Sequence, residues 1–230
     1  MIRDLLPVPA VLTAEFRVWT SQGQPGQDAV VWNPDRWRRT LPAYAALFDR
    51  LPANGLDRAA VADAFADATM TSPSVVLDAF LTSYAWGQGR NAYGPARAAR
   101  ILTANPDAAP VLAEVAQLAR TAGGPAAFGY LAANRLRGLG PAFATKFLHF
   151  AGAAADADLP PLIMDKLTAG FLAAHTGWKV NSQSWSRTEY RRYLTTAAAK
   201  ADLLGTTPTI VEYLMFRTET AKRPGNQWAP

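Results

Sequence analysis

Three features between residues 136 and 165 combine residue types and spacings that could do chemistry. The first is the segment Leu136-Arg-Gly-Leu-Gly-Pro141, in which two glycines bracket one apolar residue between two expected helices. Such a turn leaves N–H groups unpaired at the start of the second helix, where the helix dipole favours an anion. A phosphate could dock there without any reading of base sequence. Taken alone, the segment is more often a plain turn between helices, because Gly-x-Gly is common in turns.

The second and third features are a lysine and an aspartate on the next two expected helices. The apolar residues after Pro141 form one buried stripe, and Lys146 and His149 lie on the neighbouring face. Asp165 opens the following helix, where the N-terminal amides keep a carboxylate ionised. Singly, an exposed helix lysine and a capping aspartate are usually structural. Their combination with the glycine hairpin is much rarer.

The elements that must position these residues are helices. Apolar positions recur every three or four residues, Gly and Pro fall at helix-length intervals, and we find no convincing run of strands. The sequence therefore predicts an all-α fold with a polar loop at 21–27 and an irregular tail at 223–230. The expected helices span residues 8–19, 35–51 with a disturbance at Pro42, 57–68, 73–86, 95–102, 108–122, 125–137, 141–152, 165–176, 186–205 and 207–220.

The composition narrows the function classes. The chain has 230 residues, enough for one globular unit of one or two lobes. Because it contains no Cys, disulfides, Cys nucleophiles, thiolate zinc sites and Cys-ligated iron–sulfur clusters are excluded, and with only two His we expect no metal site. No apolar run approaches the roughly 20 residues of a membrane span, and the first residues lack a signal-peptide pattern. We expect a cytoplasmic protein with no membrane partner.

The charge is unevenly distributed along the chain. Of 23 basic and 18 acidic residues, 10 and 11 fall within residues 1–119, whereas 13 and 7 fall within residues 120–230. The second half therefore carries the positive excess, which fits a polyanion-binding region. We divide the chain into an N-terminal helical region, residues 1–120, and a region with the hairpin, Asp165 and the C-terminal helices, residues 121–230.

The hairpin, the lysine and the aspartate, in this order, resemble the helix-hairpin-helix superfamily of base-excision DNA glycosylases, and specifically the 8-oxoguanine glycosylases. The segment Pro161-Leu-Ile-Met-Asp165 matches the loop that ends at the family's catalytic Asp. In eukaryotic-type enzymes the lysine lies two residues beyond the second hairpin glycine, a position that Ala142 occupies here. The segment from Phe143 to Leu148, which contains Lys146, is instead similar to the archaeal branch. The resemblance covers about residues 125–176.

This resemblance implies two helical lobes with the active site between them and a bifunctional glycosylase and AP lyase that removes 8-oxoguanine. After the damaged nucleotide leaves the duplex, the Lys146 amine would attack the anomeric carbon as the base departs. Asp165 would stabilise the cationic sugar, and a Schiff base would then permit strand cleavage. The reaction needs no cofactor. It does need a neutral amine, which a semi-buried site near other cations would favour.

The implied partner is double-stranded DNA that contains an oxidised base, bound by a monomer associated with the nucleoid. For the DNA backbone the candidate contacts are Gly138, Leu139, Gly140, Arg137 and Lys166, with Arg187, Arg191 and Arg192 as further phosphate contacts. For the pocket of the flipped base the candidates border flexible segments or lie near Lys146, and they are Trp86, Gln88, His149 and Trp228.

Two other functions fit the same residues. A monofunctional glycosylase for another base, such as an alkylated one, would use Asp165 and leave Lys146 incidental. A non-catalytic helix-hairpin-helix protein would only grip phosphate, with Asp165 as a helix cap. Borohydride trapping separates the first alternative from the lyase, and Asp165→Asn would leave the second unchanged.

Overall fold

The computed structural model describes residues 7–66, 72–153 and 159–222. In these residues all named elements are helical, and the one β-type pairing is an isolated bridge between Val30 and Leu56. This confirms the expected all-α class. The elements are α1 Ala10–Ser21, α2 Pro34–Thr40, η1 Pro42–Tyr44, α3 Ala45–Arg50, α4 Arg58–Asp63, α5 Pro73–Gln88, α6 Gly94–Ala104, α7 Ala108–Thr121, α8 Gly123–Ala133, α9 Pro141–Ala151, α10 Lys166–Thr176, α11 Arg187–Leu204 and α12 Pro208–Ala221.

Several helix ends fall at the capping residues that the sequence predicts. Ser186 caps α11 by accepting a hydrogen bond from the Glu189 N–H at 3.2 Å. Asp165 caps α10 in the same manner. Gly177 and Gly205 end α10 and α11 in the left-handed conformation, with φ of 70° and 65°. Glycine adopts this conformation without the cost that a Cβ would add.

Three predicted helices differ from the structure. The expected helix over 125–137 is α8, which begins at Gly123 and ends at Ala133, because Asn134 leaves the helical conformation with φ −113° and ψ 55°. The expected helix over 35–51 is divided into α2, η1 and α3 because Pro42 has no N–H and holds the preceding Leu41 in a non-helical conformation with φ −126° and ψ 65°. The expected helix over 57–68 forms only as the short α4, which ends at Asp63. Residues 67 and 68 of that prediction lie outside the described residues.

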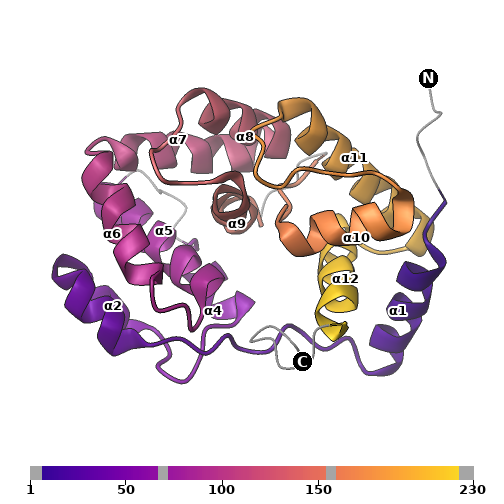
Figure 1. The fold of residues 1–230 in the computed structure, drawn as a ribbon, viewed down its shortest axis with the longest axis horizontal. Coiled ribbons are helices and arrows are strands. Elements are labelled where there is room, and N and C mark those ends of the chain that lie inside the picture. The colour runs from indigo at the N-terminus through magenta and orange to yellow at the C-terminus, as the bar shows by residue number, and fades with distance from the viewer. Residues whose placement is uncertain (1–6, 67–71, 154–158, 223–230) are drawn as a thin grey trace.

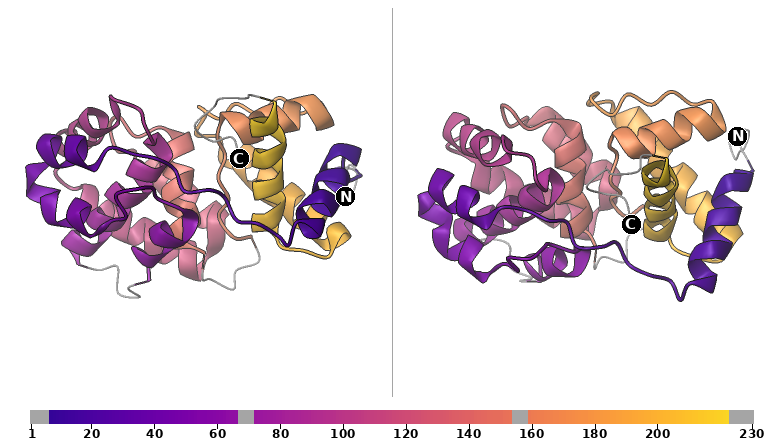
Figure 2. Two further views of the ribbon diagram at one scale, coloured as in Figure 1. Left: turned by 90° about the horizontal axis from the view of Figure 1, so that it is seen from below. Right: turned by 60° about the horizontal axis from the view of Figure 1, so that its bottom comes forward.

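The helices form two groups with α9 between them (Figure 1). One group contains α2, α4, α5 and α6, and the other contains α1, α10 and α12, with α7, α8 and α11 along one side. After α1 the chain runs in an extended segment from the second group to the first (Figure 2). Because α1 packs against α12, the N-terminal and C-terminal parts of the sequence share one group.

The central helix α9 is the most enclosed of the elements that carry site residues. It packs against α4, α5, α7 and α8, and its residues from Ala144 to Ala151 are all buried. A continuous apolar core surrounds it, with aromatic contacts such as Phe147 against Phe65 and Phe80. A polar side chain on α9 is therefore held in one position by dense packing. Within the described residues, none of the helices is long and apolar enough to cross a membrane.

Candidate active site

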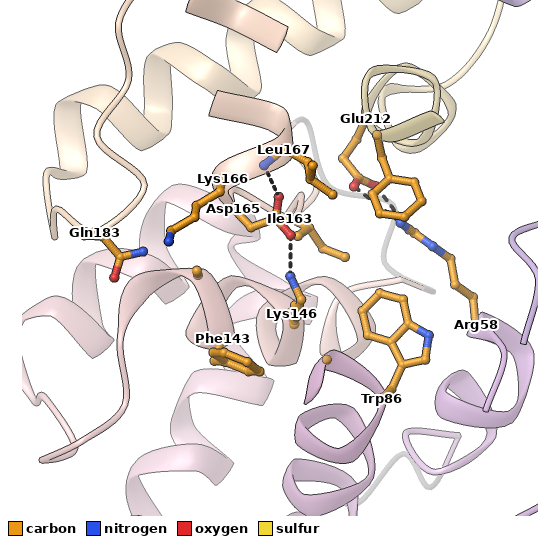
Figure 3. A pocket seen from close by; sticks show the side chains of 13 residues that line it. Arg58, Trp86, Phe143, Lys146, Ile163, Asp165, Lys166, Leu167, Gln183 and Glu212 are labelled. Atoms are coloured by element: carbon orange, nitrogen blue, oxygen red, sulfur yellow. Dashed lines mark hydrogen bonds and ion pairs between the residues drawn. The ribbon is translucent and has the colours of Figure 1, made fainter. Parts of the chain in front are cut away.

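Lys146 and Asp165 meet at the centre of the molecule. The Lys146 ammonium group donates a hydrogen bond of 2.7 Å to Oδ2 of Asp165, which also makes the two residues an ion pair (Figure 3). The lysine comes from the buried helix α9, and the aspartate is the N-cap of α10. Their side chains are only 9% and 20% exposed. The structure thus encloses both side chains in a site that is largely shielded from solvent.

The path of the Lys146 side chain depends on a glycine of α5. A Cβ at Gly87 would lie 2.8 Å from Cδ of Lys146 and 2.9 Å from Cε1 of Phe143, which is closer than real Cβ contacts allow. The Nζ atom lies 5.8 Å from the centre of the Phe143 ring and 5.9 Å from that of Trp86. Ring faces attract a cation at this range. Gly87 therefore leaves the space through which Lys146 reaches Asp165.

Asp165 is held as an ionised carboxylate. Burial opposes its ionisation, but the Lys146 ammonium group and the N–H groups of Leu167 and Thr168 outweigh burial, so the pKa of Asp165 lies below its ordinary value. Oδ1 accepts from the Leu167 N–H at 2.9 Å and the Thr168 N–H at 3.4 Å, while Oδ2 binds Lys146. The expectation that the helix N-terminus keeps Asp165 charged is consistent with this geometry.

The segment Pro161 to Met164, which precedes Asp165, is fixed residue by residue. Side chains of α9 and α11 bind its main-chain groups. From α9, His149 Nδ1 binds the Pro161 carbonyl at 3.0 Å and Thr145 binds the Met164 N–H at 3.1 Å. From α11, Tyr190 binds the Leu162 carbonyl and N–H at 2.9 and 3.2 Å, and Tyr193 binds the Ile163 carbonyl at 3.0 Å. Four polar side chains are thus used to hold four buried residues. Asp165 therefore directly follows a tightly held segment, residues 161–164, which we call the Asp165 arm.

A pocket of about 310 Å³ opens beside the pair. Ligand pockets span about 300–1,000 Å³, so this one lies at the small end of that range and has room for a single base. Its walls combine flat or apolar groups with a few charged ones, as in ligand sites generally. The lining residues are Arg58, Trp86, Gly87, Ala142, Phe143, Lys146, Ile163, Asp165, Lys166, Leu167, Gln183, Glu212 and Phe216 (Figure 3).

One wall of the pocket carries an ion pair that the sequence analysis missed. Arg58 donates from Nη1 to Oε2 of Glu212 at 3.1 Å and from Nη2 to Oε1 at 3.3 Å, and Glu212 is 1% exposed. Burial raises the pKa of Glu212, and Arg58 opposes that rise. The two residues are 154 positions apart. A carboxylate within the apolar run from Val211 to Phe216 is the sequence signal that could have identified it.

The predicted base-pocket residues differ in where the structure places them. Trp86 is buried and lines the pocket. Gln88 and His149 are 3% and 5% exposed and do not belong to the lining. Gln88 directly follows Gly87, but its side chain lies against Asn91 and Gly94, and His149 faces Arg58 and Pro161. Trp228 lies outside the described residues.

The connection before α9 is longer than the three residues that the sequence predicts, because α8 ends at Ala133 and residues 134–140 lead to α9. Within it, Leu139 is buried between the two glycines, as expected. Gly138 has φ of 88°, the left-handed region, whereas Gly140 has φ of −86° and is the N-cap of α9. Arg137 is exposed, and its N–H donates to Oδ1 of Asn105 at 2.8 Å. Asn105 also donates to the Arg137 carbonyl at 3.0 Å. This side chain, not foreseen from the sequence, ties the hairpin to the end of α6.

The hairpin and the pocket are neighbours in space. Ala142 and Phe143, in the first turn of α9, line the pocket that Lys146 enters. Lys166, an expected backbone contact, is exposed and lines the same pocket beside Gln183 (Figure 3). In the described ranges, no three His, Asp or Glu side chains gather as metal ligands would. The expected phosphate site and the expected catalytic pair therefore adjoin.

Comparison with protein families gives one match. The family described as "Putative 8-oxoguanine DNA glycosylase OGG-like protein" matches residues 23–216. The chain belongs to this OGG-like family. The match spans every residue that lines the pocket of this OGG-like glycosylase, from Arg58 to Phe216. Neither the curated proteins nor the solved structures that were compared match the chain. Membership indicates a DNA glycosylase, with DNA as its substrate.

Proposed function

We propose that this protein removes 8-oxoguanine from duplex DNA as a bifunctional glycosylase and AP lyase. The observation that carries the proposal is the contact of 2.7 Å between Lys146 Nζ and Asp165 Oδ2 at a pocket of nucleobase size. A nucleophilic amine next to a carboxylate, in a space that admits one base, suits displacement of a base from its sugar. The family match supports the lesion class.

The reaction begins when the damaged nucleotide leaves the duplex and its base enters the pocket. As the glycosidic bond breaks, its electron pair departs with the base and positive charge develops on the sugar. The Asp165 carboxylate stabilises that charge, and Lys146 Nζ bonds to the anomeric carbon. The amine must be neutral to attack, so Nζ gives a proton to the departing base, which occupies the pocket that Lys146 lines. Asp165 stays ionised in this step. The bond between the anomeric carbon and the ring oxygen then breaks, the oxygen takes up a proton to become a hydroxyl, and the nitrogen lone pair forms the C=N bond of a Schiff base. Removal of the neighbouring C2′ proton then expels the 3′ phosphate and cleaves the strand.

The DNA backbone would lie across the hairpin. The N–H groups of Gly140 and Ala142 can receive a phosphate, whereas those of Leu139, Phe143 and Ala144 donate to main-chain carbonyls. The exposed Arg137 adds positive charge nearby. Lys166 extends the contact to the mouth of the pocket. The exposed Arg187 and Arg191 at the start of α11 supply further positive charge. Trp86 offers its ring to the extruded base.

Borohydride trapping tests the proposal. Wild-type protein, mixed with a duplex that holds one 8-oxoguanine, is expected to give a covalent adduct, and Lys146→Gln is expected to give none. Lys166→Gln is the matched control, because Lys166 lines the same pocket but does not bind Asp165 in the structure. An undamaged duplex controls for specificity.

The outcomes separate the alternatives. Base release without an adduct would identify a monofunctional glycosylase, and duplexes with alkylated bases would then be compared. Binding to DNA without base release would identify a non-catalytic helix-hairpin-helix protein. An adduct that survives in Lys146→Gln and disappears in Lys166→Gln would show that the nucleophile is Lys166 and not Lys146.

A further inference from the structure

His149 is a buried polar residue for which the proposed reaction has no use. It lies on α9, one turn after Lys146, and is 5% exposed. Both ring nitrogens have partners: Nδ1 is 3.0 Å from the Pro161 carbonyl oxygen, and Nε2 is 3.1 Å from Nη1 of Arg58. One ring therefore touches the segment that ends at Asp165 and the pocket wall that carries Arg58.

The two partners fix the protonation of the ring from opposite ends. An arginine only donates, so His149 Nε2 must accept from Arg58 and carries no proton. A carbonyl only accepts, so Nδ1 must carry the proton and donate to Pro161. The groups that face the ring agree with a neutral imidazole. Burial, followed by repulsion from Arg58 and then Lys146, lowers the pKa of His149 to about 3, against the opposing bond to Pro161.

Arg58 depends on these contacts for its place in the pocket wall. Its Nη1 binds both His149 and Glu212, its Nη2 binds Glu212, and its Nε donates to Oε1 of Gln27 at 3.0 Å. The guanidinium carbon lies 5.5 Å from the Trp86 ring centre. Every nitrogen of the guanidinium group is thus engaged, and the group is packed beside the aromatic ring. His149 is the partner that comes from the same helix as Lys146.

We propose that His149 is a positioning residue with two separable tasks in the excision reaction. Its Nδ1–H holds the Pro161 carbonyl and thereby the arm that presents Asp165, and its Nε2 lone pair holds Arg58 in the wall that meets the base. The first task serves the chemical step, and the second serves binding of the extruded base. This inference rests on the proposed function, and it assigns a role that the Lys146 and Asp165 pair does not include.

Two amide variants can divide the tasks, because an asparagine amide reaches the place of Nδ1 and a glutamine amide reaches the place of Nε2. His149→Asn keeps a donor for Pro161 and loses the acceptor for Arg58. His149→Gln keeps an acceptor for Arg58 and loses the donor for Pro161. His149→Ala loses both. Folding of each variant is checked by its unfolding midpoint.

The readout is single-turnover excision of 8-oxoguanine, with the rate at saturation measured separately from the half-saturating concentration. We expect His149→Gln to lower the saturated rate about tenfold at nearly unchanged half-saturation. We expect His149→Asn to raise half-saturation about tenfold at a nearly unchanged rate. A duplex with a base-free site has no base to contact the pocket wall that contains Arg58. On this duplex, His149→Asn should therefore cleave like wild type, and His149→Gln should cleave more slowly.

A merely structural role predicts a different pattern. Both variants would then lose activity in proportion to the loss of folded protein, on both duplexes, and half-saturation would not change. That result would overturn the inference, and so would an effect of His149→Asn on the rate together with an effect of His149→Gln on half-saturation. In either case, excision by wild type would still support the proposed function. Absence of excision by wild type would instead overturn the proposed function.

Nuclear magnetic resonance of ¹⁵N-histidine gives a readout free of substrate. With only two histidines in the chain, the ring signals of His149 can be assigned by comparison with His175→Gln. We expect a neutral ring with its proton on Nδ1. A neutral ring with its proton on Nε2 would contradict both hydrogen bonds on which the inference depends, and a doubly protonated ring at neutral pH would contradict the bond from Arg58.

Discussion

The Tyr190 hydroxyl binds both main-chain groups of Leu162, donating to the carbonyl at 2.9 Å and accepting from the N–H at 3.2 Å. One side chain of α11 thus replaces the pairing that a strand or helix would give a buried peptide group. Leu162 lies three residues before Asp165, so this contact is part of the support of the Asp165 carboxylate. Tyr193 supports the next carbonyl, that of Ile163, at 3.0 Å.

We expect Tyr190→Phe to destabilise the protein more than Tyr193→Phe. The first variant leaves a buried N–H and a buried carbonyl without their partner, and the second leaves one carbonyl. Each buried group left unsatisfied costs about 1–3 kcal/mol. Urea unfolding of the two variants measures the difference. Equal losses would show that the Leu162 N–H does not depend on Tyr190.

Asp165→Asn tests charge separately from capping. Asparagine caps a helix about as well as aspartate, so α10 should keep its start. The variant loses the negative charge that faces Lys146, and removal of one preorganised charge-stabilising group lowers turnover by about 10²–10³-fold. Single-turnover excision measures the loss, with circular dichroism as the check on helix content. Unchanged excision would leave Asp165 as a helix cap alone.

Gly87→Ala tests the path of Lys146. The added Cβ would lie 2.8 Å from Lys146 Cδ, so the side chain must move away from Asp165. We expect a loss of adduct formation although no catalytic group is removed. Gly170→Ala in α10 is the matched control, because its Cβ would meet Glu219 at an ordinary 3.6 Å. Borohydride trapping should give less adduct with Gly87→Ala and an unchanged amount with Gly170→Ala. Equal amounts of adduct would contradict the steric argument.

The two hairpin glycines have different roles. Gly138 has φ of 88°, so Gly138→Ala is expected to cost about 1–2 kcal/mol of stability. A Cβ at Gly140 would come no closer than 4.0 Å to Gln183, so Gly140→Ala should leave stability nearly unchanged. If a phosphate approaches the hairpin there, Gly140→Ala should still weaken DNA binding. Unfolding and affinity measured together test the distinction, which fails if Gly140→Ala binds DNA like wild type.

The stability of the protein should fall on mild acidification because of His149. The folded ring, with its pKa lowered to about 3 chiefly by burial, stays neutral, whereas the unfolded ring takes up a proton near pH 6.5. The unfolded state therefore binds more protons, and stability is lost as the pH falls from about 6.5 towards 3, with a slope that approaches about 1.4 kcal/mol per pH unit.

Urea unfolding of wild type and His149→Gln between about pH 7 and pH 5 isolates this effect, because most carboxylates titrate below that range and Glu212, whose pKa burial raises, is present in both proteins. His149→Gln has no titrating ring at this position and should show a flatter dependence. The carboxylate of Asp165 contributes at lower pH: its pKa is held below the ordinary value, so its stabilising effect is present at neutral pH and is lost under strongly acidic conditions. An equal slope in the variant would contradict the role of His149.

The sequence by itself determined the local elements and the motif. Caps such as Ser186, the end of α11 at Gly205 and the hairpin around Leu139 follow from neighbouring residues, so they can be predicted without any distant contact. The order of hairpin, lysine and aspartate also sufficed to indicate the family that residues 23–216 match. Local chemistry failed at Pro42, where one expected helix is divided into three short elements.

Only the tertiary structure decided which distant groups share the site. The contact of Lys146 with Asp165, the pairing of Arg58 with Glu212 and the two bonds of His149 join residues from α4, α9, the Asp165 arm and α12. These contacts depend on how whole helix faces pack, and no property of the neighbouring sequence specifies that packing. Burial then gives the same residues their charge states, because removal from water changes the energy of each ionised group.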